Sequence, residues 1–234
     1  MHEEEEIPTT TATPRADIGF LLLADISGYT SFLEKVATSH PEMVRPGGQV
    51  PPAYSVMSSL LDVIVERIAP AFQLAELEGD AVFGYALDDR LAGRAAMLQE
   101  VVRLAYGAFR DRIDEAMVLH KHDCEACMIL PFLDLKFVVH HGPFVVHWIA
   151  GRQRLLSPAV NVAHRLLKNS VAQQTGRRAY LFVTDAAAER LGLSAEVGVA
   201  HQEHYADVGL VTGIVIGVDA AGSDESLGPM PATG

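Results

Sequence analysis

The order of hydrophobic and polar positions divides the chain into segments that have either the strand period or the helix period. An unbroken apolar run over residues 19–24 leads to Asp25 and a Gly/Ser turn, which predicts a buried strand that ends on an acid. Helical spacing follows over 30–39 and again over 54–68. The intervening stretch, 40–52, is so rich in proline and glycine that we expect a loop there.

The rest of the chain continues this alternation of strands and helices. Expected helices are 91–118, 159–168 and 186–191, the last with Thr184-Asp185 as its N-cap. Expected strands are 72–77, 81–86, 133–140, 144–149, 180–183 and 210–218, with hairpin turns at Gly79-Asp80 and at 141–143. Helices interspersed among hairpins predict an α/β fold of the α+β sandwich type, with helices packed over a largely antiparallel sheet.

Composition indicates one domain with polar ends. The chain has 234 residues, of which 49% are hydrophobic and 21% charged, as in ordinary globular proteins. Residues 1–15 are acidic and then rich in threonine and proline, and residues 219–234 are rich in glycine, serine and proline, so we expect flexible tails around a domain at 16–218.

Charge restricts the partners. The formal net charge of -12 argues against nucleic acid and against anionic membranes, because both are held mainly by lysine and arginine. No apolar run reaches the length of a membrane span, and the acidic N-terminus does not resemble a secretory signal. We therefore expect a cytoplasmic protein.

Two acids stand where strands of this pattern end. Asp25 closes the first strand, and Asp80 lies at the bend of a hairpin that we expect to pair beside it. Converging carboxylates repel each other unless a divalent cation lies between them, so we predict a Mg²⁺ or Mn²⁺ site. The turn after Asp25 offers backbone N–H groups at a helix start, which suit a polyphosphate. Alternatively, Asp25 only caps the helix and Asp80 is a plain turn residue.

A third segment carries an amide and a cation on one helix face. Asn161 and Arg165 are four residues apart, so they lie above each other on the predicted helix. Such a pair suits a ribose and the charge that develops on a reacting phosphate. The alternative is an ordinary surface pair on an amphipathic helix.

These segments, in this order, resemble the catalytic domain of the class III nucleotidyl (adenylate/guanylate) cyclases. The motifs that carry the resemblance are Ala24–Thr30, Glu78–Phe83, Val138–Pro143 and the Val-Asn-x-Ala-x-Arg helix Val160–Arg165. They cover roughly residues 17–218, and the fit is nearest to an uncharacterised bacterial group in that superfamily. The resemblance implies a largely antiparallel, ferredoxin-like sheet covered by helices.

The resemblance also implies roles for individual residues. Asp25 and Asp80 would bind two divalent ions, Asn161 would orient the ribose, and Arg165 would stabilise the transition state. The triphosphate would lie along the backbone of Ile26, Ser27, Gly28 and Tyr29. The family's two aspartates and its Asn/Arg pair come from opposite subunits, which implies a homodimer with composite sites. The implied reaction converts a purine nucleoside triphosphate to a 3',5'-cyclic nucleotide and pyrophosphate.

The base-selecting position and the triphosphate-binding lysine differ from the family pattern. Glu76 occupies the purine-selecting position, and its carboxylate can accept from the N1–H and 2-amino groups of guanine, which favours GTP; alternatively it is an exposed strand residue. Its usual partner falls near Arg154, which is neither Asp nor Cys. The hairpin over 205–216 has no lysine, and Lys168 is the nearest downstream of the Asn/Arg helix. These departures favour an alternative function, a catalytically degenerate nucleotide-binding or regulatory module with the cyclase fold.

An insert at 119–131 gathers possible metal ligands. His120, His122, Cys124 and Cys127 offer borderline and soft donors that tetrahedral Zn²⁺ prefers. His140, His141 or a second chain could complete such a site, and the alternative is a reduced loop whose thiols bind nothing. We expect packing roles for His147 and Trp148, and an exposed helical position for His164.

Overall fold

The structure is a computed structural model that describes residues 13–40, 52–119 and 128–218. The strands are β1 (Arg15–Ser27), β2 (Gln73–Glu78), β3 (Ala81–Leu87), β4 (Asp134–Ile149), β5 (Arg152–Leu156), β6 (Tyr180–Thr184), β7 (Val199–Tyr205) and β8 (Gly209–Gly217). The α-helices are α1 (Tyr29–Ser39), α2 (Pro52–Ile68), α3 (Asp88–Leu91), α4 (Ala95–Leu119), α6 (Pro158–Arg165), α7 (Val171–Thr175) and α8 (Asp185–Leu191). Two short 3-10 helices are η1 (Leu130–Phe132) and η2 (Ala195–Val197).

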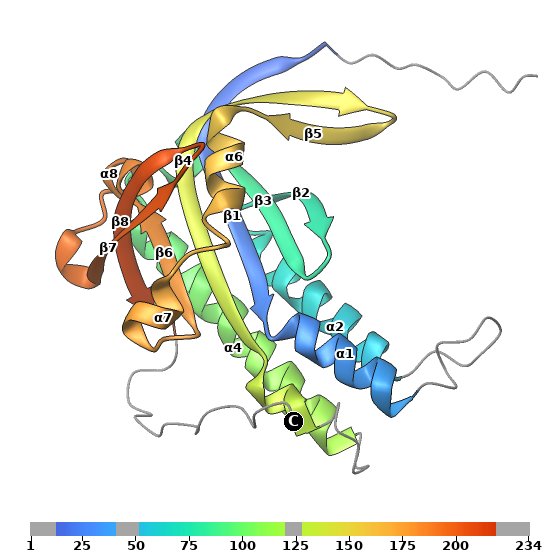
Figure 1. Cartoon of the computed structure of the whole chain (residues 1–234). Helices are drawn as coiled ribbons and strands as arrows, with labels where there is room; N and C mark the ends of the chain where they lie inside the picture. The colour runs from blue at the N-terminus through green and yellow to red at the C-terminus, as the bar shows by residue number, and fades with distance from the viewer. Residues whose placement is uncertain (1–12, 41–51, 120–127, 219–234) are drawn as a thin grey trace, which may run out of the picture.

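One mixed sheet of eight strands organises the described residues (Figure 1). Its order is β2-β3-β1-β4-β6-β8-β7, and β5 pairs with β4 outside this path. The β4–β6 pairing is parallel, and the other pairings are antiparallel. The predicted α+β sandwich with a largely antiparallel sheet is therefore confirmed.

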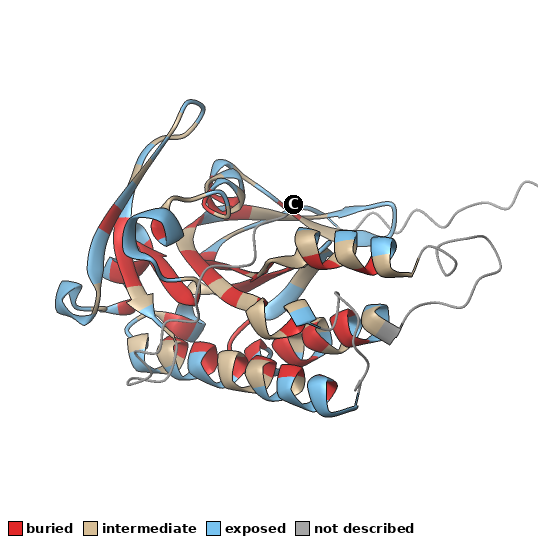
Figure 2. Ribbon diagram, turned by 60° about the horizontal axis from the view of Figure 1, so that its bottom comes forward, coloured by how far each residue is buried: buried red, intermediate tan, exposed pale blue. Residues whose placement is uncertain are grey.

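The sheet separates two apolar layers because side chains alternate between its faces. On β1, Phe20 and Leu22 belong to the cluster that packs with α1, α2, α4 and α8, whereas Leu21 and Leu23 belong to the cluster under α6 and α7. Buried positions lie on the strands and on the sides of the helices that face them (Figure 2). Asp25 has the same strand parity as Leu21 and Leu23, so its side chain is on the α6 face.

The prediction of a hairpin turn at 141–143 is wrong. Residues Asp134–Ile149 form a single strand, whose hairpin partner is β5, reached through Ala150 and Gly151. Gly142 sits inside this strand because α6 crosses it closely: a Cβ at this position would lie 2.7 Å from the Cβ of Ala159. Pro143 is opposite Ile18 in the β1–β4 register. A Gly-Pro pair therefore marks a close crossing here and not a turn.

Other boundaries differ locally. The helix expected over 91–118 is broken at Gly93, which has a φ of +69°, so α3 and α4 are separate. The closing hairpin begins earlier than the expected 205–216, because its first strand, β7, already starts at Val199. Thr184 is the N-cap of α8, but its hydroxyl contacts His140 Nδ1 at 3.0 Å and makes no capping bond.

Within the described ranges, no helix combines the length and apolar character that a membrane crossing would require. The domain limits 16–218 and the flexible tails stay predictions.

Candidate functional site

The turn between β1 and α1 presents an uncapped helix N-terminus. Gly28 is the N-cap of α1, with φ of 93° in the left-handed region, and no side chain makes a capping hydrogen bond. Glycine adopts this conformation without the steric penalty of a Cβ. The first-turn N–H groups of α1 have no partner inside the helix, so they can receive an anion, which the helix dipole also favours. This arrangement leaves Asp25 out of the cap, contrary to the alternative reading of the sequence.

Asp25 is held by a lysine that comes from the neighbouring strand. It is directly opposite Lys136 of β4 and Ala81 of β3 in the sheet register. The Nζ of Lys136 lies 2.9 Å from Asp25 Oδ2 and donates to the backbone oxygen of Leu167 at 3.0 Å. With 19% and 16% of their side chains exposed, Lys136 and Asp25 form a largely buried pair. Lys136 therefore joins the end of β1 to the segment that follows α6.

The pKa of Asp80 depends on the negative charge of the nearby Asp25. It follows Gly79 in the tight turn between β2 and β3, and its backbone oxygen accepts from Ile26 N at 3.3 Å. Burial, and then the negative charge of Asp25, raise the pKa of Asp80 to about 6, whereas the charge of Lys136 lowers it. Burial and the charge of Asp80 also raise the pKa of Tyr29, at the start of α1. Both acids thus lie in one electrostatic environment, beside the uncapped helix.

Asp25, Asp80 and the start of α1 form one corner of the molecule, and its residues are suitable ligands for a hard divalent cation. Carboxylate oxygens are the ligands that Mg²⁺ and Mn²⁺ prefer, and a cation between Asp25 and Asp80 would relieve their repulsion. Among the described residues, no group of three or more His, Cys, Asp or Glu side chains is placed to hold a metal. A site with two carboxylates is still suitable for Mg²⁺, which keeps several waters and takes phosphate oxygens as its other ligands. The predicted zinc ligands His120, His122, Cys124 and Cys127 lie outside the described residues.

Helix α6 presents Asn161 and Arg165 to the outside. The Ser157 hydroxyl caps the helix by accepting from Val160 N at 3.0 Å, and Pro158 occupies its first turn. Helix α6 lies over β4 and β1 (Figure 1). Its side toward these strands is buried, whereas Asn161 and Arg165 are exposed. The predicted shared face is therefore present.

Arg165 already has an acidic partner in its own chain. Its Nε and Nη2 lie 2.8 and 2.7 Å from Oδ2 of Asp207, a residue in the turn between β7 and β8. The side chains of Arg165 and Asp207 are 51% and 52% exposed. Within one chain, Arg165 is thus held by Asp207 and not by Asp25 or Asp80.

The base-selecting candidate Glu76 forms an ion pair with Arg154 of β5. Both residues line a cavity of about 90 Å³ under α6, together with Gln153, Phe83 and Val160. Pockets that enclose a small molecule usually have volumes of roughly 300–1,000 Å³. The cavity is thus too small for a nucleotide as it stands, although it places Glu76 and Arg154 beside α6 of the same chain.

His164 has a different environment from the exposed one expected from the sequence. Its Nε2 lies 2.8 Å from Oε1 of Glu78, and its Nδ1 contacts the backbone oxygen of Val160 at 2.8 Å. Its ring also packs edge-on against Phe83, with 4.8 Å between the ring centroids. The histidine therefore ties α6 to the β2–β3 hairpin. The expectation for Trp148 is also wrong, since 46% of its surface is exposed.

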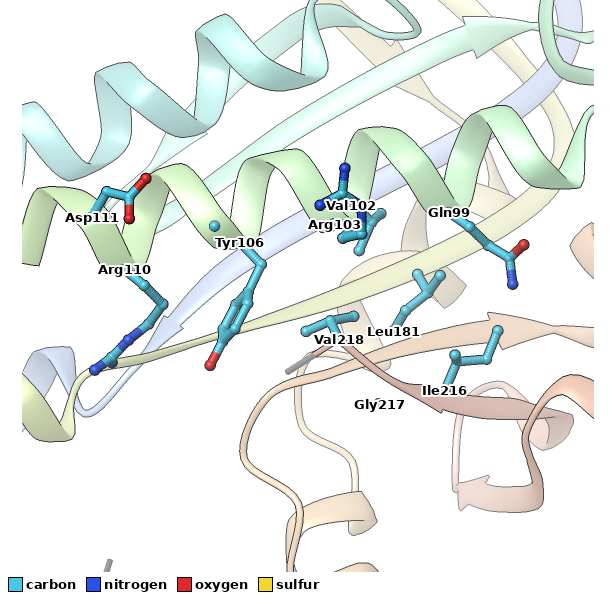
Figure 3. Close-up of a pocket in the computed structure, with 11 residues that line it drawn as sticks. Gln99, Val102, Arg103, Tyr106, Arg110, Asp111, Leu181, Ile216, Gly217 and Val218 are labelled. Carbon is cyan, nitrogen blue, oxygen red and sulfur yellow. The ribbon is translucent and has the colours of Figure 1, made fainter. Parts of the chain in front are cut away.

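A separate cavity of about 450 Å³ lies between α4 and the end of β8 (Figure 3). Tyr106 and Arg110 project below α4 in this view, whereas Asp111 projects above it (Figure 3). Arg110 Nη1 donates to the backbone oxygens of Leu133 and Pro131 at 2.9 and 3.3 Å. Neither Asp25 nor Asp80 lines this cavity, so it is distinct from the corner described above.

Sequence reasoning missed Lys136 and Asp207, which are the direct partners of two predicted site residues. Lys136 had a weak signal, because it is one of only two charged residues, with Asp134, in the otherwise apolar run 133–139. Its pairing with Asp25 depends on the register of β1 and β4, which the local pattern does not specify. Asp207 carries no signal beyond its place in a turn.

Comparisons with known proteins place the chain among uncharacterised sequences. The family model described as "Protein of unknown function (DUF2652)" matches residues 57–175. The uncharacterized protein Rv2561/Rv2562 of Mycobacterium tuberculosis is 30% identical over 135 residues, which are 58% of this chain and 60% of that protein. The match thus spans less than two-thirds of the relative's length.

Solved structures with a similar fold are class III cyclase domains. The guanylyl cyclase Cya2 is similar with a TM-score of 0.62 and 16% identity, covering 92% of this chain and 97% of that chain. A bacterial light-regulated adenylyl cyclase has a TM-score of 0.56 and 14% identity, covering 87% and 53%. The adenylyl cyclase CyaB from P. aeruginosa has a TM-score of 0.51 and 11% identity, covering 87% and 96%. At these identities the similarity shows the fold, and it agrees with the resemblance seen in the motifs.

Proposed function

The chain belongs to the DUF2652 family of proteins of unknown function and has the class III cyclase fold, and we propose that it is a metal-dependent purine nucleotidyl cyclase. The observation that carries this proposal is the convergence of Asp25 and Asp80 beside the uncapped start of α1. A buried acid beside a second carboxylate is costly to keep ionised unless a cation binds there. The pKa of Asp80, raised to about 6 by burial and by Asp25, shows this cost.

In the proposed reaction, the 3'-oxygen of the ribose forms a bond to the α-phosphorus, the bond to pyrophosphate breaks, and the 3'-hydroxyl proton is released. Asp25 and Asp80 would hold Mg²⁺ or Mn²⁺, which when bound activates the hydroxyl and neutralises phosphate charge. The first-turn N–H groups of α1 face the triphosphate. Lys136 adds a positive charge beside Asp25, 2.9 Å from its carboxylate.

The other half of the site comes from the exposed face of α6. Asn161 orients the ribose, and Arg165 stabilises the charge on the α-phosphate. Glu76 accepts hydrogen bonds from the N1–H and 2-amino groups of guanine, and Arg154 beside it can donate to the guanine O6. This pair favours GTP over ATP, provided that the small cavity under α6 opens.

We propose that the two halves meet in a homodimer. Asn161 and Arg165 point outward from α6, so a second chain can bring its own Asp25 and Asp80 against them. Exposed apolar side chains on the β4–β5 ribbon offer an interface: Trp148, Ile149 and Leu156 are 46%, 48% and 50% exposed. Apolar patches of this kind commonly mark protein–protein contacts.

The decisive experiment is a turnover assay with the full chain, Mn²⁺ and each nucleoside triphosphate, followed by chromatography for the cyclic product. We expect product with GTP from the wild type and none from Asp25→Asn or Arg165→Ala. In an equal mixture of these two variants, half of the dimers are mixed and carry one intact site, so activity should recover to about a quarter of the wild-type value. Lack of recovery by the mixture would refute the composite site.

The second candidate function is a nucleotide-binding or regulatory module without turnover. The observation in its favour is that Glu76 and Arg165 are each bound to a residue of their own chain, Arg154 and Asp207. Absence of product together with metal-dependent nucleotide binding would support this candidate. Absence of both product and binding would exclude both functions.

A further inference from the structure

Three of the side chains proposed for the nucleotide site are paired internally. Asp25 is bound to Lys136, Glu76 to Arg154 and Arg165 to Asp207. These contacts differ in burial. Asp25 and Lys136 are largely buried, whereas the side chains of Arg165 and Asp207 are 51% and 52% exposed. An exposed ion pair contributes little to the stability of a fold, so the Arg165–Asp207 contact can exchange partners easily.

Asp207 also has a fixed position relative to α6. It lies in the turn of the β7–β8 hairpin, whose flanking residues Tyr205 and Gly209 are paired in the sheet register. The Tyr205 hydroxyl donates to the backbone oxygen of Lys168 at 3.2 Å, which ties the hairpin to the segment after α6. The β7–β8 hairpin, which is itself tied to the segment after α6, therefore holds Asp207 in place next to Arg165.

We propose that Asp207 is a positioning residue that holds the Arg165 guanidinium in the nucleotide-free protein and competes with the substrate phosphate for it. The proposal rests on the proposed function, because it assigns Arg165 to a phosphate. A carboxylate and a phosphate are alternative acceptors for the same N–H donors of an arginine. Nucleotide binding must then replace Asp207, and the released carboxylate remains near a polyanion and repels it.

A binding experiment with the full chain isolates this competition. The probes are Mn²⁺ with 3'-deoxy-GTP, which has no 3'-hydroxyl to cyclise, and Mn²⁺ with tripolyphosphate, which has no base. Titration calorimetry should show that Asp207→Asn binds both probes roughly threefold to tenfold more tightly than the wild type. Asp207→Lys should bind more tightly still, because it replaces repulsion by attraction. Asp89→Asn is the matched control, since Asp89 is an exposed acid on α3 and the change in net charge is the same.

A double-mutant cycle tests whether Asp207 acts through Arg165. If it does, the gain in affinity from Asp207→Asn should be clearly smaller when it is combined with Arg165→Ala, because only the direct repulsion is then removed. An equal gain in that background would mean that Asp207 only repels the ligand directly, which would overturn the positioning role. In turnover assays, the asparagine variant should lower KM while kcat changes less than about threefold.

The outcomes separate the two proposals. Nucleotide binding by the wild type with unchanged affinity in Asp207→Asn would overturn the role of Asp207 and leave the cyclase proposal standing. Lack of binding by the wild type, Asp207→Asn and Asp207→Lys alike would overturn the proposed function, and the inference with it. The result that we expect is tighter binding by Asp207→Asn but not by Asp89→Asn, with a clearly smaller gain from Asp207→Asn in the Arg165→Ala background.

Discussion

Asp80 and Lys136 show how the chemistry of single residues depends on partners far away in the sequence. Asp80 is a turn residue by its local pattern, yet burial and Asp25 raise its pKa to about 6. Lys136 is one charge in an apolar strand, yet it contacts Asp25 at 2.9 Å and its charge lowers the pKa of Asp80. Both effects arise because β1, β3 and β4 are adjacent in the sheet.

Metal binding should depend on pH through Asp80. The proton must leave Asp80 before a cation binds, so the affinity for Mn²⁺ should be constant above about pH 6 and fall by up to about tenfold per pH unit below it. Calorimetric titrations with MnCl₂ between pH 5 and 8 measure this dependence. An affinity that does not change across this range would show that Asp80 is not a ligand.

The same pKa predicts an effect on stability in the absence of metal. Because the folded protein holds the Asp80 proton more tightly than the unfolded chain, this group lowers the free energy of unfolding as the pH rises from about 4 to about 6. Asp80→Asn should therefore be more stable than the wild type at pH 7.5 in chelator and should no longer bind Mn²⁺. Urea denaturation in EDTA gives the comparison, and a destabilised variant would contradict the assignment.

Replacing Lys136 should move the pH dependence in a known direction. Lys136→Met removes a charge that lowers the pKa of Asp80, so the midpoint for Mn²⁺ binding should shift to higher pH. Lys168→Met is the control, because Lys168 is an exposed lysine that follows α6. If both variants shift the midpoint equally, the effect comes from net charge and not from the contact with Asp25.

Among the elements, strand β4 and helix α6 depend on each other. The strand runs without interruption from Asp134 to Ile149, and α6 crosses it at Gly142, where the space for a side chain is filled by Ala159. This crossing sets the distance of Asn161 and Arg165 from the sheet. The Gly-Pro sequence of β4 looks like a turn because both residues favour turns, but here the glycine serves helix packing.

A side chain at Gly142 should separate the helix from the sheet. The new Cβ would approach Ala159 to 2.7 Å, so Gly142→Val should destabilise the protein by about 1–3 kcal/mol and weaken nucleotide binding. Gly107→Ala on α4 is the control: it meets no atom within 4 Å, and should stabilise the helix by about 0.5–1 kcal/mol. Equal effects of both substitutions on denaturation midpoints would argue against a packing role for Gly142.

The whole molecule carries the two halves of the proposed site on separate elements. Asp25, Asp80 and the start of α1 form one half, and Asn161 and Arg165 on the exposed face of α6 form the other. In a single chain the cavity under α6 is small, and Glu76 and Arg165 are held in internal ion pairs. A single chain is therefore not ready to bind the substrate. A second chain is the partner that the proposed chemistry requires.

The exposed ribbon of β4 and β5 predicts how that partner is held. Removing the indole of Trp148, which is 46% exposed, should weaken self-association by at least about 2 kcal/mol, or roughly thirtyfold. Sedimentation velocity over a concentration series compares Trp148→Ser with the wild type. Leu104→Ser is the control, because Leu104 is 42% exposed on α4, on the other side of the sheet. A monomeric wild type at micromolar concentration would contradict the homodimer.

The local pattern of the chain determined most elements of this protein. Alternation and helical spacing predicted β1, α1, α2, the β2–β3 hairpin and the sandwich of helices on a sheet, because these features depend on neighbouring residues. The acid near the end of β1 and the Asn/Arg pair on α6 were visible for the same reason, since strand and helix periods alone place them at an edge or on one face.

Tertiary structure alone decided which charges meet. Lys136 reaches Asp25 through the β1–β4 register, Arg154 reaches Glu76 through β5, and Asp207 reaches Arg165 through the β7–β8 hairpin. The continuity of β4 through Gly142 was also hidden, because a glycine required by a crossing helix looks the same as a glycine required by a turn. A one-dimensional pattern records the period of each segment, but the contacts between distant segments arise only when the sheet assembles.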